Sequence, residues 1–227
     1  PSGDVERVEL TSLRKTIARR LTEAWQAPAF QISMTADMTG ALEIRKQLVE
    51  LHPDEKPTIS DLLTRLSAAA LMRHRELNAH FAGDAIELHP TANVGLAVAT
   101  DRGLVVPVIR SAERKTVAEI ARDRAELVER ARNGKLQRDD LEGGTFTISN
   151  LGMYGVERFI AVLNPPQVAI LAVGAIREQP VVVDGQVIVQ PRMDLTLTSD
   201  HRAVDGSVAA EFLATLKSYV ENPALAL

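Results

Sequence analysis

Residues 193–216 read MDLTLTSDHRAVDGSVAAEFLATL and predict three consecutive elements. The first six alternate apolar and polar side chains, a pattern typical of a strand with one buried face. The polar segment SDHRAVDG (199–206) ends that alternation. Beyond it, Val208, Phe212 and Leu216 recur every four residues, which predicts a closing helix. The most polar break in the C-terminal half therefore lies between a strand and a helix.

Further strands are predicted upstream of this stretch. Runs rich in apolar and β-branched residues, separated by Gly and Pro, are GTFTISN (144–150), QVAILAVGA (167–175), VVV (181–183) and QVIV (186–189). Two earlier runs, NVGLAVAT (93–100) and LVVPVIR (104–110), flank the short turn Asp101-Arg102-Gly103. That spacing predicts a hairpin.

Helical spacing is found in four other segments. Near the start, apolar residues recur every four positions from Leu13 to Trp25, behind Thr11 and Ser12 as capping residues, and Pro28 ends the pattern. Alternation from Phe30 to Met38 then predicts a half-buried strand. The remaining predicted helices run from Leu42 toward Pro53, from near Ser60 through Ala70, and from Thr116 to Asn133 before Gly134.

This order of elements favours one fold class. Grouped helices and long mixed strands, without regular strand–helix alternation, indicate an α/β two-layer sandwich (α+β) in which helices cover a mixed sheet. The first residues, PSGDVERVEL, are polar and begin with Pro-Ser-Gly. We interpret residues 1–8 as the end of an interdomain linker from a larger parent chain, and residues 9–227 as one domain.

Composition excludes several classes of function. The 227 residues carry a net charge of −4, so the basic surface that binds nucleic acid non-specifically is not expected. The longest apolar or glycine run, residues 168–176, is half of the roughly 18 residues that a membrane span needs. Cysteine is absent, which excludes disulfides and thiolate metal sites. The five histidines are never three to five residues apart, so no metal site is predicted.

His201 and Asp205 form the first candidate for chemistry. A His followed four residues later by an Asp is common in turns, and His80 and Asp84 show the same spacing here. The surroundings distinguish the two pairs, because a buried-looking strand precedes His201 and would hold a base rigidly. Gly206 follows, where a close backbone approach is permitted. No strand is predicted before the His80 pair.

Hydroxyl groups in the predicted strand 144–150 form the second candidate. Alternation places Thr145, Thr147 and Ser149 on one face. Two interpretations are open: the row is an exposed strand face, or Ser149 at the strand end donates a hydrogen bond to an oxyanion. A serine nucleophile has less support, because the Gly-x-Ser-x-Gly elbow is absent around Ser149.

Five ordered motifs resemble one known family. They are LTSLRKTIARRL (10–21), NVGLAVATDRGLVVPVIR (93–110), EGGTFTISNLGMYG (142–155), LNPPQVAILAVGAI (163–176) and SDHRAVDGSVAAEFLATLKSYVENP (199–223). The chain thereby resembles the catalytic, inner-core domain of dihydrolipoamide acyltransferases, of pyruvate or branched-chain type, from 2-oxo acid dehydrogenase complexes. The resemblance implies the chloramphenicol acetyltransferase fold, homotrimers with active sites between subunits, and assembly of the trimers into a larger hollow core.

The resemblance also implies site residues. His201 matches the family's base, Asp205 its partner in the Asp-His-Arg-x-x-Asp-Gly motif, and Ser149 the hydroxyl, supplied by a neighbouring subunit, that stabilises the tetrahedral intermediate. The implied contacts to coenzyme A fall on Arg45, Ser60, Ser149, Asn150, Gly174 and Ile176. One position departs from the family, since Ala99 stands where an Asp often occurs. For Asp205 we favour an ion pair with Arg202 or another Arg over orientation of the imidazole.

The implied reaction is acyl transfer, acetyl or branched-chain, from a dihydrolipoyl thioester to coenzyme A. The lipoyl group would be carried on a domain outside this sequence, and 2-oxo acid decarboxylase and dihydrolipoamide dehydrogenase components would bind through missing N-terminal segments. No metal, nucleic acid or membrane partner is expected, and the location would be cytoplasmic, or the mitochondrial matrix in a eukaryote. The alternatives are a coenzyme A-dependent acetyltransferase for a small alcohol or amine, and a non-catalytic core scaffold. A scaffold would be expected to lack His201 or Ser149, which are both present.

Overall fold

The main sheet is mixed, as the sequence predicts. The computed structural model describes residues 3–101 and 103–227, in which the sheet order is β1-β11-β9-β8-β4-β7, with β10 paired to β11. Its strands are β1 (Ala29–Asp37), β4 (Val94–Leu96), β7 (Val108–Ile109), β8 (Phe146–Asn150), β9 (Ala169–Val173), β10 (Arg177–Val183) and β11 (Gln186–Asp200). Strand β8 runs parallel to β4 and β9, whereas the other pairs are antiparallel.

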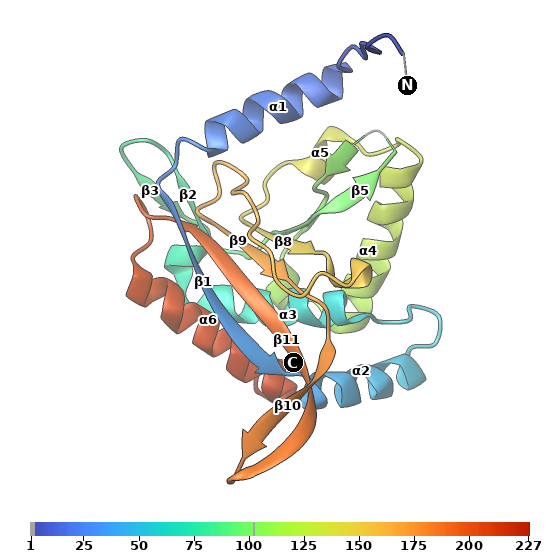
Figure 1. Ribbon diagram of the computed structural model, residues 1–227, viewed down its shortest axis with the longest axis vertical. Coiled ribbons are helices and arrows are strands. Elements are labelled where there is room, and N and C mark those ends of the chain that lie inside the picture. Colours follow the sequence, from blue (N-terminus) through green and yellow to red (C-terminus); the bar gives the residue numbers. More distant parts are fainter. Residues whose placement is uncertain (1–2, 102) are drawn as a thin grey trace.

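Helices cover one face of this sheet and enclose the main core. The helices are α1 (Ser12–Ala24), α2 (Thr39–Leu51), α3 (Ile59–Arg73), α4 (Val117–Arg132), α5 (Arg138–Leu141) and α6 (Gly206–Glu221). Helix α3 contacts both α4 and α6, and α6 packs on β1 (Figure 1). Phe146 of β8 and Phe212 of α6 are fully buried, with ring centroids 5.7 Å apart. The predicted sandwich of helices on a mixed sheet is confirmed.

The opposite face of the sheet is more polar and carries irregular chain. Ala161 and Leu163 pack there against Ile170 and Ala172 of β9 in a small second cluster. Side chains of β9 alternate between this cluster and the main core, as the period of two in a strand requires. Thr147 and Ser149 of β8 and Thr196 and Thr198 of β11 alternate with main-core residues and face this side, whereas Asn150 at the end of β8 contacts α3.

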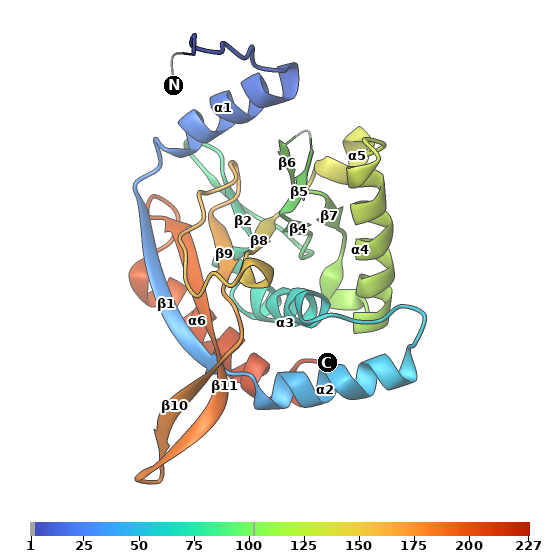
Figure 2. The same cartoon turned by 45° about the vertical axis from the view of Figure 1, so that its right-hand side comes forward.

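Two parts of the fold project from the body. Helix α1 lies apart from the sheet, and the β10–β11 hairpin extends at the opposite end of the molecule (Figures 1 and 2). Trp25, next to α1, is 79% exposed, and Val187 in the hairpin is 72% exposed. Residues 3–10 are exposed and form no helix or strand. Within the described chain, none of the helices has both the length and the apolar character needed to cross a membrane.

One strand prediction needs correction, and another is confirmed in more detail. The runs 186–189 and 193–199 are one continuous strand, β11, in which Pro191 pairs with Glu178. The chain tolerates Pro191 because the pairing of β11 passes from β10 toward β1 near this point, where Arg192 already faces Asp37. The predicted 93–110 hairpin is confirmed, and it consists of two paired parts: β4 pairs antiparallel with β7 in the main sheet, and β5 (Val98–Thr100) pairs antiparallel with β6 (Gly103–Val105) nearer the turn. Of its predicted turn, Arg102 lies outside the described residues.

One hairpin has no counterpart in the sequence analysis. Strands β2 (Ala79–Phe81) and β3 (Ile86–Leu88) pair antiparallel. Three residues are too few to show a period, which explains why the run before Asp84 gave no strand signal. His80 therefore lies within a strand rather than in an isolated turn.

Candidate active site

His201 lies directly after β11, in the loop that leads to α6. Its backbone N–H donates to the carbonyl of Pro28 at 3.1 Å, and its ring lies 4.6 Å from the ring of Phe30 in β1. The His201 side chain is 51% exposed in the single chain. The rigid strand before it is as predicted. The imidazole is thus held by β1 on one side and remains open to an incoming molecule or subunit.

Asp200 shapes the loop that carries His201. This side chain is 3% exposed, and its two oxygens accept from the Arg202 guanidinium at 2.9 and 2.6 Å and from the Arg202 backbone N–H at 3.0 Å. These hydrogen bonds to Asp200 raise the pKa of Arg202 above its ordinary value. Arg202 also lies over the ring of Phe81, 4.0 Å from its centroid. Sequence reasoning missed this role of Asp200, although its position beside His201 was visible.

Asp205 does not form the ion pair with Arg202 that the sequence analysis favoured. Because Arg202 pairs with Asp200, it is not the partner of Asp205. Asp205 instead places Oδ1 3.9 Å from Nδ1 of His201. It occupies the cap position of α6, but its side chain makes no capping hydrogen bond within the described part of the chain. Asp205 therefore lies where it can approach the imidazole, at a separation longer than a hydrogen bond.

Gly206 has open space beside it within the single chain. A Cβ atom built at this position meets no other atom within 4 Å. No other part of the chain that the structure describes therefore approaches the backbone of Gly206 closely. A close approach occurs instead at Gly174, where an added Cβ would overlap the backbone oxygen of Glu157. Gly174 is one of the positions implied for coenzyme A.

Ser149 and His201 are far apart within one chain. Ser149 is level with Ala172 of β9, which is level with Thr196 of β11. His201 follows Thr196 by five residues, which at the usual rise places it about 16 Å further along that strand. Ser149 also lies two strands away from β11. A single chain therefore does not bring these two candidate residues together.

The row of hydroxyls on β8 is largely buried, so its interpretation as an exposed strand face is wrong. Thr145 donates to Oδ1 of Asn78 at 2.6 Å, and Thr147 donates to Oε1 of Gln167 at 2.6 Å. Both threonines are at most 1% exposed. These hydrogen bonds satisfy groups that would be costly to bury unpaired. Ser149, at the end of the row, is partly exposed.

Several positions implied for coenzyme A lie where the central strands β8 and β9 end. Asn150 ends β8 and is level with Val173, the residue before Gly174. The side-chain amide of Asn150 donates to Oγ of Ser60 in the first turn of α3 at 3.1 Å. Ser60 and Asn150 therefore meet at the start of α3, with Gly174 following the residue paired to Asn150, whereas Ser149 precedes Asn150 on the other face of β8.

Arg45 of α2 and Ile176 after β9 lie in parts of the chain that neighbour this region. Arg45 donates from Nε to the carbonyl of Pro57 at 3.2 Å, just before α3. Ile176 is partly buried against the main core, two residues past Gly174. Ala99, the position that departs from the family, is exposed in β5.

The fold defines a class. A mixed sheet covered by helices, in this strand order, is a chloramphenicol acetyltransferase-like arrangement. The structure matches chloramphenicol acetyltransferase with a TM-score of 0.56 at 12% identity, over 89% of this chain and 94% of that one. At that identity the likeness shows the fold alone.

The family is narrower than this class. The chain belongs to the 2-oxoacid dehydrogenases acyltransferase (catalytic domain) family, whose family model matches residues 2–227. It is 40% identical over 220 residues to the dihydrolipoyllysine-residue acetyltransferase component of the pyruvate dehydrogenase complex of Rickettsia felis. This match covers 95% of the chain and 53% of that protein. The chain thus spans about half the length of the curated relatives it matches.

Solved structures agree with this assignment. The dihydrolipoamide acetyltransferase of Azotobacter vinelandii, studied for the roles of a serine, a histidine and an asparagine in its catalytic mechanism, matches with a TM-score of 0.94 and 33% identity. The cubic core of the pyruvate dehydrogenase multienzyme complex gives the same two values. Each match covers 99% of this chain and 94% of the other.

Proposed function

We propose that this domain transfers an acetyl group from a dihydrolipoyl thioester to the thiol of coenzyme A. Membership of the acyltransferase family and a relative named as an acetyltransferase support this reaction. The single observation that carries it is His201, held at the end of β11 with its ring open to solvent. None of the relatives described above supports a branched-chain acyl group over acetyl.

His201 is proposed as the general base. A thiol with a pKa of about 8.5 is only a few per cent ionised at pH 7, so a neutral imidazole at the sulfur promotes attack. Because Nδ1 faces Asp205, Nε2 is the nitrogen available to take the thiol proton. The sulfur then bonds to the acyl carbon, and the proton passes from the imidazole to the departing dihydrolipoyl sulfur.

Asp205 is proposed to bias the His201 ring. Its carboxylate stands near Nδ1 and would favour the tautomer that keeps the hydrogen there. The Azotobacter vinelandii study concerns a histidine and an asparagine whose numbers differ by four. This chain has the same spacing with an aspartate, which adds a negative charge beside the imidazolium as it forms.

Ser149 is proposed to stabilise the oxyanion from a neighbouring subunit. The separation of Ser149 and His201 within the chain makes this hypothesis necessary, because one chain alone cannot supply both groups to one acyl carbon. Ser149 would donate from its hydroxyl to the developing negative charge. Coenzyme A is proposed to bind where β8 and β9 end, through Arg45, Ser60, Asn150, Gly174 and Ile176.

Assembly into a homotrimer, and of trimers into a larger hollow core, is proposed on two grounds. A similar structure is the cubic core of a pyruvate dehydrogenase complex. In addition, Leu21 of α1 and Trp25 at its end are 47% and 79% exposed, so these two apolar side chains are largely uncovered within one chain. Exposed apolar groups on a helix of this kind usually mark a protein interface. Met153 and Tyr154, 74% and 70% exposed, are proposed to pack at the same kind of contact.

The remaining predictions concern the parent protein. We propose that residues 1–8 end a linker, that a lipoyl domain precedes it, and that the decarboxylase and dihydrolipoamide dehydrogenase components bind to segments outside this sequence. The complex would operate in the cytoplasm, or in the matrix of a mitochondrion.

The proposed reaction is tested by a coenzyme A assay with acetyl, isobutyryl and succinyl dihydrolipoamide as donors. We expect acetyl to be the preferred donor, and His201→Ala to reduce turnover about 10²- to 10⁴-fold, the usual contribution of general-base catalysis. His52→Ala, outside the site, is the control and should leave turnover unchanged. If His201→Ala kept turnover within about threefold of the native protein, the base assignment would be wrong.

A further inference from the structure

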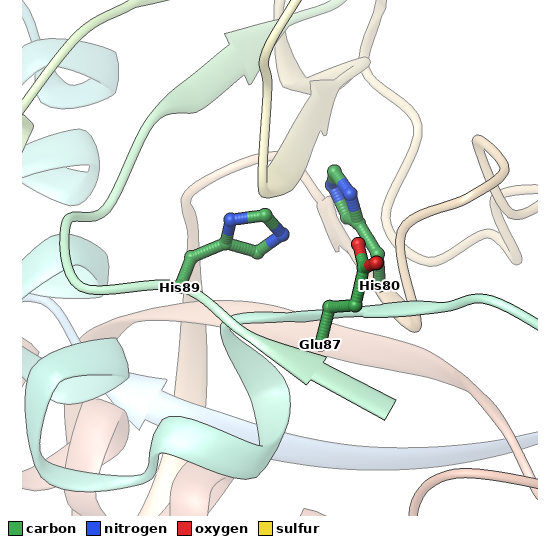
Figure 3. A group of neighbouring side chains, drawn as sticks. All are labelled: His80, Glu87 and His89. Carbon is green, nitrogen blue, oxygen red and sulfur yellow. The ribbon is translucent and has the colours of Figure 1, made fainter. Parts of the chain in front are cut away.

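The β2–β3 hairpin brings together three side chains that the proposed reaction does not use. His80, Glu87 and His89 each offer one ligating atom, and these atoms lie within 4.8 Å of one another (Figure 3). We propose that these three residues bind a divalent transition-metal ion of the zinc type. Spacing along the sequence did not predict the site, because the histidines are nine positions apart and meet only through the pairing of the strands.

Strand geometry explains how the three side chains converge. His80 of β2 lies directly opposite Glu87 of β3. Side chains at such paired positions have Cβ atoms about 4.5–5.5 Å apart. His89 follows Glu87 by two residues and therefore projects from the same face of the hairpin. The rings of His80 and His89 have centroids 4.1 Å apart.

The hydrogen bonds of His80 leave one nitrogen free for a metal. Nε2 of His80 lies 2.9 Å from the carbonyl oxygen of Gly144. A carbonyl only accepts hydrogen bonds, so Nε2 carries the hydrogen and Nδ1 keeps its free electron pair. Metal-binding histidines commonly donate their second ring N–H to a backbone carbonyl in this way. The contact with Gly144 therefore prepares His80 as a ligand.

His89 offers an atom that lacks a partner. Its Nε2 is buried and has no hydrogen-bond partner among the described residues. A buried polar atom without a partner is unusual and is satisfied when it coordinates a metal ion. Figure 3 shows the His89 ring directed toward His80 and Glu87. The carboxylate of Glu87, on an exposed residue, supplies the negative charge that a divalent cation favours.

The backbone beneath the site is already ordered. The N–H of His89 donates to the carbonyl of Asn78 at 3.0 Å, and the Asn78 side-chain amide donates back to the carbonyl of His89 at 3.2 Å. On the other strand, the N–H of Phe81 donates to the carbonyl of Pro166 at 2.9 Å. Binding a metal therefore requires movement of side chains rather than of the strands.

The donor set selects the class of metal. Two imidazoles and one carboxylate suit zinc and its neighbours in the first transition series, whereas magnesium and calcium prefer oxygen ligands. Ligands of tetrahedral zinc, bound at about 2.0–2.1 Å, are about 3.3 Å apart, so rotation of the exposed Glu87 side chain must close the remaining gap. A water molecule would complete the coordination, as in other sites with three protein ligands.

The ion would stabilise the hairpin beside the proposed active site. Phe81, the neighbour of His80 in β2, supports Arg202 of the loop that carries His201. A metal that joins β2 to β3 would hold Phe81 in place. We assign the ion no step in acyl transfer, so the proposal stands or falls independently of the proposed function.

Calorimetric titration with zinc chloride tests the site. The full chain, produced without a histidine tag and dialysed against a chelator, should bind one zinc ion and show a higher Tm with zinc, because a ligand that binds only the folded state stabilises it. Glu87→Gln and His89→Gln should each weaken zinc binding by at least about tenfold, comparable with the loss of even a supporting residue of a metal site.

The control is His52→Gln, which removes a histidine outside the hairpin and should bind zinc as the native chain does. Circular dichroism establishes that each variant is folded. Because Glu87 is exposed, Glu87→Gln should fold even if His89→Gln does not. The proposal is overturned if the native chain binds no zinc, or if Glu87→Gln binds zinc with native affinity.

Discussion

At the scale of single residues, Asp200 determines the geometry around His201. It accepts three hydrogen bonds from the Arg202 guanidinium and one from the Arg202 backbone while nearly fully buried. Its own carbonyl accepts from the N–H groups of Ala203 and Val204. The exposed imidazole is therefore placed by a neighbour that makes no contact with substrate in the proposed reaction.

Asp200→Ala is expected to destabilise the protein and to impair catalysis. Loss of hydrogen bonds to a charged group costs about 1.5–3 kcal/mol, and Arg202 would lose its partner. Urea unfolding measures the stability and the coenzyme A assay measures kcat. Asp194→Ala is a matched control, because Asp194 accepts from Arg158 elsewhere. A normal kcat in folded Asp200→Ala would show that this loop does not depend on Asp200.

His74 gives the protein a pH dependence. Burial, followed by the charge of Arg73, lowers the pKa of His74 below its ordinary value. The unfolded chain then binds a proton more readily than the folded chain. The contribution of His74 to the free energy of unfolding is therefore fully present above the unfolded pKa of about 6.5, and it is lost as the pH falls below that value. His74→Gln should flatten the stability profile between pH 7 and 5, leaving a smaller slope from His89, whose pKa burial also lowers. An unchanged profile in urea unfolding would contradict this assignment.

At the scale of elements, the start of α3 links stability to the proposed coenzyme site. Thr58 and Asp61 form a capping box, and Asp61, fully buried, also accepts from Nε of Arg124 at 2.7 Å. Ser60, in the same turn, accepts from the side chain of Asn150. The cap therefore positions a residue proposed to bind coenzyme A.

Thr58→Ala is expected to cost about 1 kcal/mol of stability, the usual value for loss of a helix cap. It should also raise the KM for coenzyme A, because the first turn with Ser60 loosens. Thr116→Ala removes the matching capping box of α4, away from Ser60, and serves as the control. The control should lose similar stability in urea while keeping its KM. Equal KM values in the two variants would separate the cap from the coenzyme site.

Most elements were predictable because they are long enough to show a period. Helices α1, α4 and α6, and strand β1, begin and end close to their predicted residues, since capping residues and proline mark them. The short pair β2–β3 was missed, and with it the meeting of His80 and His89. His201 was singled out as a candidate base from its neighbours along the chain, and that assignment stays a prediction. The partnership of Asp200 with Arg202 depends on side-chain geometry, which no pattern records.

At the scale of the whole molecule, the chain separates the groups that the proposed reaction must combine. His201 follows β11 near the level of Ala169, whereas Ser149 is level with Ala172, two strands from β11. Helix α1 and the β10–β11 hairpin project with exposed apolar residues. Subunit contacts therefore offer the means both to cover these surfaces and to bring a serine to a histidine.

Mixing two inactive variants tests this arrangement. In His201→Ala and Ser149→Ala proteins that are unfolded and refolded together, random assembly of symmetric trimers leaves about one quarter of the interfaces with both groups intact. We expect turnover to rise to about that fraction of the native value, far above either variant alone, since each loss costs about 10²-fold or more. The variants refolded separately and then mixed are the control. No gain on joint refolding, with trimers present by light scattering, would place the two residues in different sites.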